Sequence, residues 1–392
     1  MDSKSNRAMK RPAWGSVALV LWSVVLTVLL IRAALQPHRL SSLTTYLTGG
    51  AAWQTLSPLY TDWRGFVYPP AIAWFFSLLR TLPLILAAVL WRALTVGAFL
   101  FGLGALLRSG VFHRIPPASR GLVFIAALPL SIGNIDNAQA NPLIAGLMML
   151  AVAALLTESW TLCAFAIAVA IAFKVYPVAL ALLLCLLRPK QLSWRIALIL
   201  LLLLALPFAL QDGHYVSAQY HAWLQTRVAD DRFHYPMKDA PLDLWYLLVR
   251  LGNLPLPVRA YEAFQIMTGI AIAAMVWLRA RRGMATADNL AALYLLVSVW
   301  MLLLGPATEN QTYVVLAPAA SLLLVQTFYS GSLASRILAC SAYAFLLAAV
   351  CRNSLIPSLK SPPFMAIQPI GALILLAAIL CDLPRATPAS PR

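Results

Sequence analysis

Long apolar runs fill most of this chain, and they limit the possible fold more than any other feature. Of its 392 residues, 61% are hydrophobic and 11% are charged, and the mean hydropathy is +0.81. A soluble domain carries about 25% charged residues. In hydrocarbon every backbone N–H and C=O group needs an internal partner, which a helix supplies. The sequence therefore predicts an all-α, polytopic transmembrane helical bundle that forms a single integral membrane domain over residues 1–392.

The apolar runs predict about twelve crossings, several of them short, since about 20 apolar residues span a bilayer. The expected spans are 14–33, 85–107, 119–135, 142–157, 159–173, 175–188, 194–211, 257–278, 287–304, 311–329, 334–351 and 363–381. The segment 70–84 is expected to be re-entrant or interfacial, because 34–69 should lie outside and 108–120 inside. The Pro-, Ser- and Arg-rich end, 383–392, is expected to be a disordered tail.

The distribution of Lys and Arg predicts the orientation, because cytoplasmic loops carry an excess of both. Basic residues flank both ends of the chain: Lys4, Arg7, Lys10, Arg11, Arg385 and Arg392. Both termini are therefore expected to be cytoplasmic, in a bacterial inner (cell) membrane. The net charge of +16 does not indicate nucleic acid, because the basic residues are dispersed between apolar runs. The five cysteines show no CxxC spacing, so neither a disulfide framework nor a metal site is expected.

Two long hydrophilic connections, 34–69 and 212–255, are expected on the outer face. Both mix aromatic, basic and acidic side chains. Such a mixture suits a site for sugar and phosphate at the level of the lipid headgroups. For any single Trp or Tyr, the alternative is the aromatic belt common to membrane proteins.

Three acidic residues, Asp62, Asp136 and Glu309, stand beside polar motifs of the outer face. A carboxylate at membrane depth is costly and is a functional candidate by default. Asp136 interrupts an apolar run, in a polar stretch that ends at Asn141-Pro142, where Asn141 is expected to cap the next helix. For Glu309 two interpretations remain open, a cap at a helix N-terminus or a catalytic role.

Lys174 lies between two apolar runs and is followed by Tyr176-Pro177. Its side chain could snorkel to the membrane surface, or its charge could hold a phosphate at the membrane boundary. Its position at an outer helix end, where the charge bias disfavours a cation, favours the phosphate site.

These motifs together resemble glycosyltransferase family 87. The similarity covers about residues 40 to 330 and rests on the order of four motifs along the chain. They are Tyr68-Pro69-Pro70, then Asn137, Gln139 and Asn141, then Lys174, Tyr176 and Pro177, and then Pro306, Thr308 and Glu309. The stretch from Gln219 to Arg232 also resembles a subgroup of this family.

The resemblance implies a GT-C-like membrane glycosyltransferase. Such an enzyme moves a hexose, typically mannose in this family, from a polyprenyl-phosphate donor to a lipid or glycan acceptor on the outer face, with inversion at the anomeric carbon. The sugar donor is a substrate, and no cofactor is expected. The other expected partners are membrane lipids. A carboxylate would act as base on the acceptor hydroxyl, and cations or amides would stabilise the departing phosphate.

The chain departs from the family pattern at one important position. Members usually carry an Asp, the expected base, four residues before a Tyr of the first outer loop, and here Ser42 stands four residues before Tyr46. A serine cannot replace a carboxylate as base, so Asp62 or Asp136 is predicted to take the role. The remaining predicted roles are phosphate binding by Lys174 and Arg64, sugar binding by Asn137, Gln139 and Asn141, and shaping of the pocket by Tyr68 and Glu309. Tyr176 is also predicted to bind substrate.

Two other classes of function are compatible with a membrane bundle. A transporter would show two related halves and broken helices near the midplane, and neither pattern is evident. A non-catalytic membrane or assembly protein derived from this family agrees with Ser42.

Overall fold

The computed structural model describes residues 13–62, 65–305, 309–355 and 361–383. All regular structure in these ranges is helical, which confirms the predicted fold class. The tail expected to be disordered falls almost entirely outside the described residues, as do Arg64, Pro306 and Thr308.

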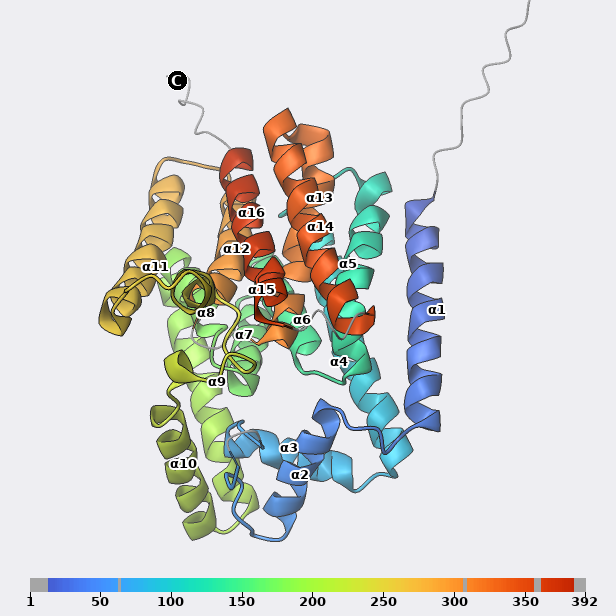
Figure 1. The fold of residues 1–392 in the computed structure, drawn as a ribbon, viewed down its shortest axis with the longest axis vertical. Coiled ribbons are helices and arrows are strands. Elements are labelled where there is room, and N and C mark those ends of the chain that lie inside the picture. Colours follow the sequence, from blue (N-terminus) through green and yellow to red (C-terminus); the bar gives the residue numbers. More distant parts are fainter. Residues whose placement is uncertain (1–12, 63–64, 306–308, 356–360, 384–392) are drawn as a thin grey trace, which may run out of the picture.

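Long helices run roughly side by side through the molecule (Figure 1). Nine helical stretches among the described residues are long and apolar enough to cross a membrane. They are α1 (Trp14–Leu35), α4 (Leu84–Ser109), η1 with α5 (Pro117–Ser119, Arg120–Asp136), α9 (Pro189–Leu210), α11 (Val258–Arg281), α12 (Thr286–Leu303), η4 with α13 (Asn310–Val315, Leu316–Ser330), α14 (Leu333–Leu355) and α15 with α16 (Pro362–Met365, Ile367–Asp382). The start of α1 and the end of α16 lie at the same end of the bundle (Figure 1).

Three further apolar helices lie where crossings were expected but are shorter. They are α6 (Asn141–Leu156), α7 (Trp160–Phe173) and α8 (Val178–Leu187). At 1.5 Å per residue they extend about 24, 21 and 15 Å, against a hydrocarbon core of about 30 Å. The expected count of about twelve spans is therefore not confirmed.

The two outer connections of the sequence meet in space. α2 (Ser42–Gln54), α3 (Pro70–Arg80) and α10 (Gly213–Val228) gather at the end of the bundle opposite the start of α1 (Figure 1). Side chains of α10 bind the segment between α2 and α3: Gln219 Oε1 accepts a hydrogen bond from Leu59 N at 2.9 Å, and Trp223 Nε1 donates to Val67 O at 3.2 Å. After α10, a loop with η2 (Arg232–His234) leads to η3 (Tyr246–Leu251).

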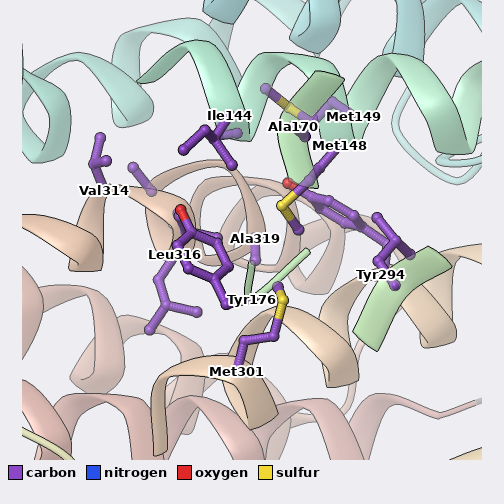
Figure 2. Close-up of a cluster of buried hydrophobic side chains, with 14 of the residues drawn as sticks. Ile144, Met148, Met149, Ala170, Tyr176, Tyr294, Met301, Val314, Leu316 and Ala319 are labelled. Carbon is purple, nitrogen blue, oxygen red and sulfur yellow. The ribbon is translucent and has the colours of Figure 1, made fainter. Parts of the chain in front are cut away.

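The core is densely packed. Figure 2 shows one cluster of buried side chains, with Met148 and Met149 of α6 beside Tyr294 and Met301 of α12. α4 and α6 approach most closely at two glycines, where an added Cβ on Gly146 would lie 2.2 Å from Ala98 O and one on Gly102 would lie 2.1 Å from Gly146 O. Only a residue without a side chain permits this contact.

We therefore expect Gly146→Ala to lower the free energy of unfolding by about 1–3 kcal/mol, because the two backbones must move apart. The matched control is Gly97→Ala in α4, where an added Cβ meets nothing within 4 Å. Thermal unfolding followed by circular dichroism in detergent measures both variants. Equal midpoints for the two would show that this helix contact is not tight.

Candidate functional site

A cavity of about 510 Å³ opens between the end of the bundle and the outer segments. We call it the polar cavity. It is lined by residues of α2, of the segment 65–68, of the α5–α6 connection, of the segment 227–242 and of the start of η4. They include Ser42, Tyr46, Tyr68, Gln139, Arg227, Asp230, Arg232, Lys238, Glu309 and Asn310.

Tyr46 holds three walls of the polar cavity together. Its hydroxyl accepts hydrogen bonds from Tyr68 Oη and from Ala140 N, both at 3.2 Å, and donates to Gln139 Oε1 at 3.4 Å. Its ring stacks on Phe76 of α3 with the centroids 4.6 Å apart. Tyr46 is 2% exposed, so these bonds form away from water, where leaving a hydroxyl unpaired is costly.

Ser42 is tied to the α5–α6 connection by two hydrogen bonds. Ser42 N donates to Asn137 O at 3.1 Å, and Asn137 Nδ2 donates to Ser42 Oγ at 3.3 Å. The connection itself is held by Trp91 of α4, whose Nε1 donates to Ala138 O at 2.8 Å. The position at which the expected base is missing is therefore rigidly placed on the wall of the polar cavity.

The segment after α10 supplies most of the charge. Arg232 forms a buried ion pair with Asp243 at 3.0 Å, and Tyr246 N donates to the other oxygen of Asp243 at 3.0 Å. Asp230 is engaged by Arg227 at 3.5 Å and by the hydroxyl of Tyr235. Arg227 and Arg232 both line the polar cavity, each paired with an aspartate.

Glu309 adds a further carboxylate to the polar cavity. It is the residue before η4, and its backbone oxygen accepts a hydrogen bond from Thr312 N at 2.9 Å. Glu309 stands at the N-cap position of η4, where one of its two interpretations expected it, and its side chain makes no capping hydrogen bond. Within the described residues its exposed carboxylate is engaged in no ion pair, and it lines the polar cavity.

Asp136 lies in a different place. Its Oδ2 atom is 2.8 Å from Arg39 and 3.3 Å from Arg32, and its backbone oxygen accepts from Arg92 Nη2 at 2.8 Å. It lines a second cavity of about 490 Å³ beside α1. Its carboxylate is therefore occupied by two guanidiniums, and Asp136 is not among the residues that line the polar cavity.

A family model for glycosyltransferase family 87 matches residues 66–306. The chain belongs to this family. Membership confirms the resemblance of the motifs and implies a membrane glycosyltransferase. A search of the curated proteins found no match.

The match to family 87 includes most of the residues predicted for the site, and the structure brings only some of them together. Tyr68, Gln139 and Glu309 line the polar cavity, and Asn137 reaches it through Ser42. Asp62 is not among the residues that line it. The backbone oxygen of Asp62 accepts a hydrogen bond at 2.9 Å from the N–H of Gly65, which does line the cavity. Arg64 lies outside the described residues.

The other three predicted residues lie elsewhere. Lys174 is the C-cap residue of α7 and is half-buried. It lines neither the polar cavity nor the cavity beside α1. Tyr176 packs in the core cluster of Figure 2. Asn141 does not cap α6, because the helix begins at this residue and its Nδ2 donates instead to Gln311 O at 3.0 Å. It thereby connects α6 to η4, next to Glu309.

Several residues of the two cavities were not predicted as site residues. Arg227, Arg232 and Lys238 were recognised only as part of a charged outer segment. Arg32 and Arg39 were missed, although two arginines near the outer end of the first span break the charge bias and were a usable signal. Among the described residues, no group of three or more His, Cys, Asp or Glu side chains could hold a metal ion.

The buried Asp243 allows a prediction about pH. Burial raises its pKa to about 6, although the Arg232 guanidinium and Tyr246 N–H oppose the rise. On acidification through pH 6 the folded chain should therefore protonate Asp243 and weaken its ion pair with Arg232. Because the folded pKa lies above the unfolded value of about 3.9, this carboxyl stabilises the fold most below about pH 4, and that stabilisation is lost as the pH rises through 6.

Infrared difference spectroscopy measures this protonation through the C=O stretch of a neutral carboxyl group. We expect the band to appear with a midpoint near pH 6 and to be missing in Asp243→Asn. A band with its midpoint near pH 4 in both proteins would contradict the assignment.

Proposed function

We propose that the chain transfers a hexose, specifically mannose, from a polyprenyl-phosphate donor to an acceptor hydroxyl on the outer face of the membrane. Two findings support this proposal. The chain belongs to family 87, and the polar cavity combines cations, amides and a carboxylate at the end of a bundle with nine candidate spans among its described residues. A donor with a polyprenyl tail stays in the bilayer, so a site at this end suits it.

The observation that carries the proposal is the environment of Glu309. A general base needs an ionised carboxylate within hydrogen-bond reach of the acceptor hydroxyl. Glu309 faces the same cavity as Ser42, Gln139 and Tyr68, whereas Asp136 is held by two arginines outside that cavity. We therefore assign the base to Glu309, with Asp62 and Asp136 as the alternatives.

The reaction follows from these positions. The acceptor O–H gives its proton to Glu309 while its oxygen attacks the anomeric carbon from the face opposite the phosphate. The bond between that carbon and the phosphate oxygen breaks, so the configuration inverts and polyprenyl phosphate leaves. Arg227, Arg232 and Lys238 stabilise the negative charge of the leaving group, and Gln139 binds a sugar hydroxyl. Transfer needs no redox partner.

The decisive experiment uses purified protein in nanodiscs with radiolabelled polyprenyl-phosphate mannose and a membrane-lipid extract as acceptor. We expect Glu309→Gln to lower turnover by about 10²–10⁴-fold, the usual contribution of a general base. Asp62→Asn, Asp136→Asn and the exposed control Glu262→Gln should stay within a few-fold of wild type. Full activity of Glu309→Gln together with loss in Asp62→Asn or Asp136→Asn would move the base to that aspartate.

A non-catalytic role is the second candidate, because Ser42 stands at the position of the family base and is hydrogen-bonded to Asn137. In that case the wild-type protein would transfer no label to any acceptor, from this or other polyprenyl-linked sugars.

A carboxylate at position 42 would lie on the wall of the polar cavity that Ser42 now occupies. We therefore expect the double variant Ser42→Asp with Glu309→Gln to recover part of the turnover lost in Glu309→Gln. The control is Ser42→Asn with Glu309→Gln, which has nearly the same shape but cannot accept the proton. Equal turnover of the two double variants would show that position 42 does not reach the acceptor.

A further inference from the structure

The cavity beside α1 has an apolar part and a cationic part. We call it the α1 cavity. Its apolar lining includes Leu29 of α1, Leu130 of α5, and Leu346 and Val350 of α14. α1 stands at the edge of the bundle, next to α5 and α4 (Figure 1), and much of its surface is exposed and apolar. A cavity between such helices is accessible to a hydrocarbon chain.

The cationic part is centred on Asp136. Arg32 and Arg39 both contact one oxygen of its carboxylate, and Arg92 contacts its backbone oxygen. Three guanidiniums against one carboxylate leave two positive charges uncompensated at this point. Each guanidinium has five N–H donors, and the contact with Asp136 uses a single nitrogen of Arg32 and of Arg39. The remaining donors suit the oxygens of a phosphate, which arginine binds with good geometry.

Two buried amides complete the lining. Asn134 is 7% exposed and Gln368 is 3% exposed, and both line the α1 cavity. In the part of the chain that the structure describes, Asn134 Oδ1 and Gln368 Oε1 have no hydrogen-bond partner. An unpaired buried acceptor is costly, so a ligand with hydroxyl groups would be favoured here.

We propose that the α1 cavity binds the headgroup of a phosphate-bearing membrane lipid. Arg32 and Arg39 hold the phosphate, Asn134 and Gln368 accept from headgroup hydroxyls, and the tail lies against α1 and α14. The proposal does not depend on Glu309 being the base. The lipid could be a polyprenyl phosphate or a phosphoglycerolipid, since both carry a phosphate on a hydrocarbon tail.

The two cavities adjoin each other. Asn310 lines both, and Asn137 lines the α1 cavity while its Nδ2 donates to Ser42 Oγ in the polar cavity. A lipid held by Arg32 and Arg39 would therefore have its headgroup next to the proposed reaction site.

Binding can be tested directly on the full chain in detergent by native mass spectrometry. The probes are phosphatidylglycerol and polyprenyl phosphate, with diacylglycerol and polyprenol as the counterparts without phosphate. Wild-type protein should prefer at least one phosphate lipid over its counterpart. Arg32→Gln and Arg39→Gln should each weaken that binding about tenfold or more, as expected for lost charge-assisted hydrogen bonds.

The matched control is Arg259→Gln, which removes an exposed arginine at the start of α11 and should bind like wild type. Glu309→Gln should also keep lipid binding, so that failure of the catalytic assignment is distinguishable from failure of this one. The lipid whose affinity falls in the two arginine variants identifies the occupant. Wild-type affinity of both variants for both lipids, or equal binding of the counterparts without phosphate, would overturn the proposal.

Discussion

The arrangement of α2, α3 and the α5–α6 connection at one end of the bundle depends on the hydroxyl of Tyr46. It joins α2 to Tyr68, two residues before α3, and to the connection between α5 and α6, and so links three separate segments of the chain. Its ring lies among Phe76, Tyr68 and Trp91, so the bonds are shielded from water. Hydrogen bonds in a low-dielectric environment are strong and directional, and these set the positions of Ser42 and Gln139 relative to each other.

The two cavities differ in how their charges are balanced. In the polar cavity most cations are matched by nearby acids, as in the pairs Arg232–Asp243 and Arg227–Asp230, which keeps guanidiniums fixed where water is partly excluded. Around Asp136 the cations exceed the acids. The first arrangement suits a leaving group whose charge develops during a reaction, and the second suits a ligand that already carries its charge.

The helices could be predicted from the sequence because each apolar run is long, and the structure has a helix in every expected span. The number of spans is not confirmed at α6, α7 and α8, since hydropathy does not distinguish a span from a short helix buried by its neighbours. Motif order also placed Tyr68, Gln139 and Glu309 in one cavity. Other contacts join residues about one hundred positions apart: Asp136 pairs with Arg32 and Arg39, and Ser42 pairs with Asn137. No local sequence pattern predicts such contacts.

Asn310 belongs to the walls of two cavities at once. Any occupant that moves this residue changes the shape of the neighbouring cavity as well as its own. Thermodynamic linkage then requires the influence to be mutual: if a lipid beside α1 alters the affinity of the polar cavity for a sugar by some factor, the sugar alters the affinity for the lipid by the same factor. One shared asparagine thus provides a physical basis for coupled binding in the two cavities.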